Sequence, residues 1–375
     1  MHFALAGICL VLLGGCTTVN PYYDPSKPHH TAEGFINNYT ATVNKTFSEL
    51  IRWQIERRQQ GLPKPPQQPV PVQAADLVSV HNYGRPVGGK PQPPAITWIG
   101  HDSMLVQAGG LNVLTDPVFS ERASPVQFFG PRRAQAPGIA LADLPLINVV
   151  PISHNHYDHL DKDSVLDIAR RSEAAGKPTL FLVPLGIKAW FTDLDISNVI
   201  EMDWWDSKTY KGVEFNFTPV QHWSARSFGD RSQTLWGGYA VFAPDFHWYF
   251  SGDTGYSRDF TDTRERFVGR QTPENGGGFD LALIAVGAYQ PRWFMPANMS
   301  TLPKPCKFTP TLVPNAASAC TGAPLSLLTN PLTSPPKTWS WLSNRRACKR
   351  RTSRSWRWVK RGFSRLDFVP NRRLT

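Results

Sequence analysis

The sequence lacks several features that would each have fixed its class. None of its apolar runs reaches the roughly 18 residues that a transmembrane helix needs, and the run near the start covers only Phe3–Leu13. Of its five cysteines, only Cys9 and Cys16 precede residue 300, which excludes a disulfide-stapled body. No internal repeat is visible, which excludes solenoid and propeller architectures. A globular chain of 375 residues remains, long enough for a sizeable core.

Acidic residues are almost absent from the last part of the chain. Residues 300–375 hold 15 of the 40 Lys and Arg residues but only one acid, Asp367, and no histidine. The net charge of +11 comes from this tail, because the preceding residues carry 25 basic and 28 acidic side chains. One interpretation is a basic arm that binds anionic lipid or nucleic acid. We favour another, that the tail is translated out of frame from about residue 298, because the composition changes abruptly after Met299.

A dense group of metal-binding side chains follows the apolar segment 146–152, which has the pattern of a buried strand. His154, His156, Asp158 and His159 fall within six residues. On an extended segment, residues two apart point to the same side, so His154 and His156 could hold one ion together. Asp158 and His159 could turn to a second ion, since imidazole and carboxylate are ligands that Zn²⁺ accepts. The alternative is a solvated polar loop, which this density of histidines does not favour.

Two further candidates stand at predicted strand ends downstream. His222 follows the strand-like segment 213–220, and Asp253 follows the apolar run 247–250, within Ser251–Gly255. A carboxylate flanked by glycines at a strand end suits a ligand shared by two ions, although such a turn taken alone is usually structural. Together with the first group, these two residues complete most of a two-metal set.

This ordered series of residues resembles the metallo-β-lactamase superfamily, and within it the branch of the N-acylphosphatidylethanolamine-hydrolysing phospholipases D. The resemblance runs from about Tyr83 to Met295. It rests on these segments: Trp98–His101, Leu114–Pro125, Gly130–Arg133, Ile152–Leu160, Trp204–Trp205, Gln221–Trp223, Gly252–Tyr256 and Gly287–Met295. Short predicted strands interleaved with helices indicate a layered α/β fold. The resemblance implies an α/β fold of the four-layer αββα sandwich type, incomplete at the C-terminus.

The resemblance also implies a reaction, in which two zinc ions share a bridging hydroxide and hydrolyse a phosphodiester. It assigns the ligands as follows: His154, His156 and His222 to the first ion, Asp158 and His159 to the second, and Asp253 to both. Asp158 would also orient the nucleophile, whereas Asp116 and His101 would orient ligands. The implied substrate is an N-acylphosphatidylethanolamine-like phospholipid. A same-fold hydrolase of another ester, such as a lactone or β-lactam, is the alternative.

The family has one more metal-binding histidine, in a stretch similar to Met-His-Trp-Gly, and this chain has no histidine after residue 247. In the codons for Ala319–Ala323, the reading frame that starts at the third base permits Met-His-Trp-Gly. This recoding favours a frameshift over a genuine basic arm. We therefore expect a disordered tail, and an inactive lipoprotein is a third candidate function.

The N-terminus predicts export. The apolar segment ends in Leu13-Gly14-Gly15-Cys16, which resembles the bacterial lipoprotein cleavage box with Cys16 as the lipidated residue. The alternative is a buried cysteine in an N-terminal helix. Residues 17–31 are expected to form an extended tether, and 35–58 a helix whose apolar stripe packs on the catalytic domain rather than on lipid. Five prolines in 61–71 predict a linker.

The predicted organisation has four parts. These are a lipoprotein signal peptide at 1–15, a tether, helix and linker at 16–80, a hydrolase domain at 81–299 and an aberrant basic tail at 300–375. We expect the outer membrane, facing the periplasm, as the location, because Thr17 rather than Asp follows the lipidated cysteine. The expected partners are a phospholipid substrate and the membrane, through the lipid anchor, with no nucleic acid. The oligomeric state stays open.

Overall fold

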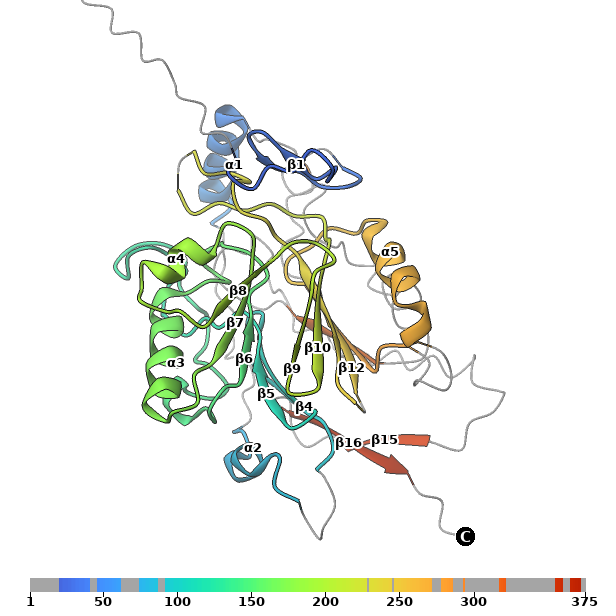
Figure 1. Cartoon of the computed structure of the whole chain (residues 1–375). Helices are drawn as coiled ribbons and strands as arrows, with labels where there is room; N and C mark the ends of the chain where they lie inside the picture. Colours follow the sequence, from blue (N-terminus) through green and yellow to red (C-terminus); the bar gives the residue numbers. More distant parts are fainter. Residues whose placement is uncertain are drawn as a thin grey trace, which may run out of the picture.

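Two β-sheets lie between helices in the computed structural model (Figure 1). It describes residues 20–40, 46–61, 74–86, 92–271 apart from 228 and 245, 278–285 and 293, and the backbone of three strands in the tail. Helices α3 (Lys162–Ala174) and α4 (Lys188–Thr192) cover one outer side, and α5 (Asp259–Arg266) covers the other. This is the αββα order of layers, so the predicted fold class is confirmed.

The first sheet has the strand order β15-β16-β3-β4-β5-β6-β7-β8. Its strands are β3 (Ala95–Gly100), β4 (Ser103–Ala108), β5 (Leu111–Leu114), β6 (Val149–Pro151), β7 (Leu180–Pro184), β8 (Val199–Met202), β15 (Ser355–Val359) and β16 (Arg365–Asn371). The predicted meander is confirmed as β3 to β5, and β5 to β8 run parallel. Its turn uses Gly109 and Gly110 at φ of +59° and +77°, which residues with a Cβ avoid.

The second sheet has the order β14-β13-β12-β11-β10-β9. Its strands are β9 (Ser207–Tyr210), β10 (Val213–Thr218), β11 (Gly238–Phe242), β12 (His247–Phe250), β13 (Leu281–Ala285) and β14 (Ala317–Thr321). Strands β9 to β12 are antiparallel, whereas β12, β13 and β14 run parallel. Parallel strands at one side of each sheet bring several strand ends to the same edge, where loops can gather.

The central core lies between the sheets, where Val106 and Leu182 of the first sheet and Phe215 and Trp248 of the second are buried. Tyr239 of β11 also crosses this layer. Its hydroxyl donates to the carbonyl of Leu182 on β7 and to that of Ile152, the residue after β6, at 3.0 Å each. The two sheets are therefore tied together directly beside the loop that follows β6.

Helix α3 covers the outer face of the first sheet because its apolar residues recur at helical spacing. Val165, Ile168 and Ala169 are buried against this face. The chain leaves the helix at Gly176 with φ of +65°, the left-handed conformation typical of a helix C-terminus. The predicted helix from Asp163 to about residue 175 is confirmed. On the opposite side, α5 buries Phe260, and a 3₁₀ turn, η2 (Val268–Arg270), follows it. Another 3₁₀ turn, η1 (Leu141–Asp143), precedes β6, and its Leu141 packs against the same core as α3.

The N-terminal segment differs from its prediction. Instead of a tether, the described part from residue 20 forms a hairpin of β1 (His30–Thr31) and β2 (Gly34–Phe35), and Phe35 enters the central core. The predicted helix over 35–58 begins too early. Residues 35–40 are not helical, and α1 (Phe47–Gln59) begins after Thr46, which forms a capping box with Glu49. A short helix, α2 (Leu77–Asn82), follows.

The apolar stripe of α1 does not pack as predicted. Leu50, Ile51 and Ile55 are 39%, 42% and 50% exposed, whereas Trp53 is buried. The spacing of the apolar residues was correct for one face, but three of them stay exposed. No helix in the described part of the chain is long and apolar enough to cross a membrane.

Three segments of the tail are strands, where the sequence predicted disorder. Strand β14 pairs in parallel with β13, and β15 and β16 form a hairpin beside β3. Trp356, Trp358 and Val369 belong to short alternating or β-branched stretches, which favour strands. The edges of β13 and β3 offer the unpaired backbone groups that such segments join.

Candidate metal centre

The predicted ligands lie on loops at strand ends, and Asp116 fixes the loop that carries four of them. Ser153, the first residue of this loop after Ile152, donates to Asp116 twice. Its backbone N–H lies 2.7 Å from Asp116 Oδ1, and its hydroxyl lies 2.5 Å from Oδ2. Because one buried carboxylate accepts both bonds, it fixes the direction in which the loop leaves β6.

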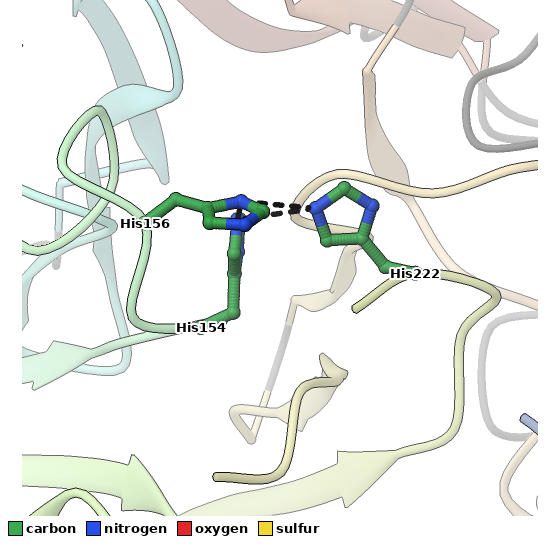
Figure 2. A group of neighbouring side chains, drawn as sticks. All are labelled: His154, His156 and His222. Carbon is green, nitrogen blue, oxygen red and sulfur yellow. Dashed lines mark hydrogen bonds between the residues drawn. The ribbon is translucent and has the colours of Figure 1, made fainter. Parts of the chain in front are cut away.

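Three imidazoles meet at the first site (Figure 2). His154 Nε2 lies 2.7 Å from His156 Nδ1, and His222 Nε2 lies 3.2 Å from the first and 3.4 Å from the second of these atoms. Around a tetrahedral ion with metal–nitrogen bonds of about 2.05 Å, nitrogens stand about 3.3 Å apart. Two of the three distances match this value and the third requires a small widening, so the three nitrogens fit one divalent ion.

A second group contains one imidazole and two carboxylates. His159 Nε2 lies 3.3 Å from Asp253 Oδ2 and 3.8 Å from Asp158 Oδ2. Asp253 Oδ2 is also 3.8 Å from His222 Nε2, at the first site. This oxygen therefore lies between the two groups, where a ligand shared by two ions is needed. The structure brings all six predicted ligands together.

The two groups differ in the charge that they stabilise. Burial, together with the neighbouring imidazoles, holds the pKa of His154 well below its ordinary value, and burial with His222 lowers the pKa of His156 to about 3. Both rings are therefore neutral, the form that binds a metal. Burial would also lower the pKa of His159, but the charges of Asp253 and Asp158 outweigh it and raise the pKa well above its usual value. The second group therefore favours a positive charge.

Two predicted orienting residues touch the ligands. Asp116 Oδ2 lies 2.7 Å from His159 Nδ1, so it holds the ring with Nε2 turned toward Asp253. His101 Nε2 lies 3.3 Å from Asp158 Oδ2, and its backbone adopts a φ of +50°, which is uncommon outside glycine. Asp116 thus suits a group that orients a metal ligand through its second polar atom. His101 contacts the same Asp158 oxygen that lies near His159 Nε2.

Arg226 is a functional residue that was not predicted from the sequence. Its Nη1 donates to the carbonyls of Asn155 and Leu160, both at 2.8 Å, and its guanidinium lies 4.0 Å from the centre of the Tyr157 ring. The side chain thus joins the beginning and the end of the ligand loop. The sole signal in the sequence was its position four residues after His222, too weak to assign a role.

Asn37 was also missed. It lies in the segment predicted to be helix and contacts the backbone of His222. Two predicted features fall where the structure does not test them. Cys16 lies outside the described residues, and of the motif at 287–295 the description covers only Trp293.

The layers and the two adjoining ligand groups define the site of a metal-dependent hydrolase with the metallo-β-lactamase fold. Comparison with protein families agrees, because residues 111–324 match the family described as "Beta-lactamase superfamily domain". The chain belongs to this superfamily.

Relatives within the superfamily include an uncharacterized protein of Mycobacterium tuberculosis, 34% identical over 273 residues, which are 71% of this chain and 66% of that protein. The chain is also 38% identical over 211 residues to N-acyl-phosphatidylethanolamine-hydrolyzing phospholipase D 1 of Caenorhabditis elegans, covering 54% of this chain and 56% of the relative. The chain thus spans between about half and two thirds of the length of these relatives. Among solved structures, an isothiocyanate hydrolase from Delia radicum gut bacteria matches 63% of this chain and 88% of its own, with 18% identity and a TM-score of 0.47.

Proposed function

We propose that this chain is a zinc-dependent phosphodiesterase that hydrolyses N-acylphosphatidylethanolamine-like phospholipids in the manner of a phospholipase D. The observation that carries the proposal is the position of Asp253 Oδ2, 3.3 Å from His159 Nε2 and 3.8 Å from His222 Nε2. Two ions around such an oxygen suit phosphodiester chemistry, because charge builds on the attacking and the leaving oxygen. Imidazole and carboxylate together suit zinc. The similarity to the nematode phospholipase D supports the substrate class.

The ligands would divide between two zinc ions as follows: His154, His156 and His222 on the first, Asp158 and His159 on the second, and Asp253 on both. Bound zinc would lower the pKa of a water molecule and stabilise charge on the phosphoryl oxygens. The protein holds the ligands in place through Asp116 and Arg226, which fix the loop before the chemistry begins.

Asp158 is suited to move the proton. Burial would raise its pKa, but the charge of His159 and the contact with His101 lower it below the ordinary value. The carboxylate is therefore ionised and can accept the proton of the attacking water. The water oxygen bonds to phosphorus, the bond from phosphorus to the ethanolamine oxygen breaks, and the proton passes to that leaving oxygen. The products are phosphatidate and an N-acylethanolamine.

We also propose that the protein works at a membrane of the bacterial envelope, anchored through lipidated Cys16. Support comes from the loop between β5 and β6, where Phe128 and Phe129 are 85% and 74% exposed. The loop is ordered, because the Gln127 side chain binds both backbone groups of Arg122 at 3.0 and 3.1 Å. Aromatic rings held outward by an ordered loop suit insertion at a lipid interface.

The full chain, purified with added zinc, tests the proposal on vesicles that contain N-acylphosphatidylethanolamine, with a lactone and nitrocefin as competing substrates. We expect release of an N-acylethanolamine and two zinc ions per chain. Turnover of the lactone or nitrocefin alone would assign the site to another ester. Fewer than two ions with no turnover would support the inactive lipoprotein, a candidate kept by the lack of any histidine after residue 247.

A further inference from the structure

The segment from Asn20 to Thr40 is part of the folded body. The ring of Phe35 is buried in the central core, and its backbone N–H donates to the Ser232 carbonyl at 2.8 Å. A few residues later, the Asn38 side chain donates to Asp259 Oδ1 on α5 at 2.9 Å. Residues 36 and 37 are therefore held between two fixed points, one in the core and one on the outer helix.

Asn37, between these points, contacts a predicted metal ligand through two hydrogen bonds. Its Nδ2 donates to the His222 carbonyl at 3.0 Å, and its Oδ1 accepts the His222 backbone N–H at 3.0 Å. The side-chain amide thus pairs with both backbone groups of one residue, as a neighbouring strand would. The same Oδ1 lies 3.2 Å from Trp236 Nε1, and Trp236 is fully buried.

His222 needs such support because it lies outside the regular part of β10. The strand ends at Thr218, and the residues after it make a single bridge, between Gln221 and Gly255. That bridge, in which the Gly255 N–H donates to the Gln221 carbonyl at 2.8 Å, joins the His222 loop to the loop that carries Asp253. Asn37 holds the His222 loop from the other side. The imidazole of His222 is therefore placed by contacts on two flanks of a short irregular segment.

We propose that Asn37 is a positioning residue for the first metal ion, so that the N-terminal segment completes the metal centre. Asn37 is not among the side chains whose atoms are grouped to hold the ion. It fixes the backbone of His222, and this places Nε2 at 3.2 Å from His154 Nε2. Groups that orient a ligand in this way typically change metal affinity ten- to a hundredfold when they are removed.

The chain offers a matched control in the next residue. Asn37→Ala removes both bonds to His222, whereas Asn38→Ala removes the bond to Asp259, which is on α5 and is no predicted ligand. Both changes shorten an asparagine of the same segment. Zinc affinity is measured by competition with a chromophoric chelator for the full chain and each variant. The absorption spectrum of the cobalt(II)-loaded protein reports the ligand geometry, and thermal unfolding of the metal-free protein reports stability.

We expect Asn37→Ala to bind the first zinc ion about ten- to a hundredfold more weakly and to change the cobalt spectrum. Asn38→Ala should have the zinc affinity and the cobalt spectrum of the unchanged chain, even if the two variants lose similar thermal stability. Equal zinc affinity of Asn37→Ala and the unchanged chain would overturn the proposal, as would an equal loss in Asn38→Ala. A chain that binds no zinc at all would instead overturn the proposed function on which this inference rests.

A second variant covers the case in which Asn37→Ala does not fold. Asn37→Asp keeps an acceptor for the N–H groups of His222 and Trp236, but it replaces the donor to the His222 carbonyl by a carboxylate oxygen that repels this carbonyl. It should displace the backbone of His222 and weaken zinc binding. Unchanged zinc affinity and an unchanged cobalt spectrum in Asn37→Asp would also contradict the positioning role.

Discussion

The two halves of the metal centre are built differently. The first half consists of three imidazole nitrogens, 2.7 to 3.4 Å apart, and burial keeps the rings of His154 and His156 neutral. The second half has one imidazole, His159, between carboxylates that raise its pKa. The first half is therefore complete and ready for a cation, whereas in the second half a proton on His159 competes with the cation. The comparison predicts two ions of unequal affinity.

Removal of metal should have the largest effect. Dialysis against a chelator is expected to abolish hydrolysis, because in the proposed mechanism bound zinc would activate the water and stabilise the charge on the phosphoryl oxygens. Titration of zinc back into the protein, followed by calorimetry and activity, should show a tight first step and a weaker second step. A single step that fills both halves together would contradict the difference between them.

The next largest effects are expected when one imidazole is removed from either half of the centre. His222→Ala should lose the first ion and lower kcat/KM by about a thousandfold or more, equal to about 4 kcal/mol. His159→Ala should also inactivate the enzyme but keep about one zinc per chain, since the first half stays intact. Metal analysis of the two variants measures how many zinc ions each one keeps. A His159→Ala protein without bound zinc would show that the two halves do not bind metal independently.

Asp116 links both halves, since it holds Ser153 and His159. Asp116→Asn keeps the size of the side chain but weakens both contacts, so zinc affinity should fall about ten- to a hundredfold. Asp161→Asn is the matched control, because Asp161 is buried and binds Phe119 and Ser120 rather than a ligand. Equal zinc affinity in the two variants would show that Asp116 does not orient the metal ligands.

The dependence of zinc binding on pH should separate the halves without a mutation. The raised pKa of His159 means that its proton must leave before the second ion binds, so this affinity should increase by about tenfold per pH unit below that pKa. Burial lowers the pKa values of His154 and His156, that of His156 to about 3, so both rings are neutral from pH 5 to 8 and their protons do not compete with the first ion. The affinity for the first ion should therefore depend less on pH. Zinc titrations at pH 5, 6, 7 and 8 measure both, and a steep first step would reverse the assignment.

The smallest effect is expected far from both halves. Ile168 of α3 is buried against the outer face of the first sheet, and Ile168→Val removes one methyl group from that packing. The free energy of unfolding should fall by about 1 kcal/mol. Zinc affinity and kcat should not change. Chemical denaturation and zinc titration of the same preparation check the two parts, and a change in zinc affinity would mean that the centre depends on packing at α3.

Local pattern was sufficient for much of the body. The helix at Lys162–Ala174 and the meander before Leu114 were predicted because buried residues recur with the period of each element. The ligand residues could be found for a similar reason. Burial of histidines and carboxylates costs free energy unless they are paired or bind a metal, so a cluster of them at strand ends indicates a site. Their spacing is visible in the sequence.

The N-terminal segment and the tail were not predicted correctly from local sequence pattern. The stripe of Leu50, Ile51 and Ile55 has the right spacing for packing, yet it is exposed, because spacing defines a face and not what covers it. Of the tail strands, β14 pairs with β13 and β16 pairs with β3, both far away in sequence, while β15 pairs with β16. The open edges of β13 and β3 select these partners.

The sequence by itself determined the class of chemistry, because the types of metal-binding residue and their order along the chain indicate the site of a metal-dependent hydrolase. Only the tertiary structure decided how the site is supported. Asn37 meets His222 across 185 residues, and Arg226 joins the two ends of the ligand loop. Contacts of this kind leave no periodic pattern in the sequence. They depend on which distant segments the fold brings side by side, and not on the neighbouring residues in the chain.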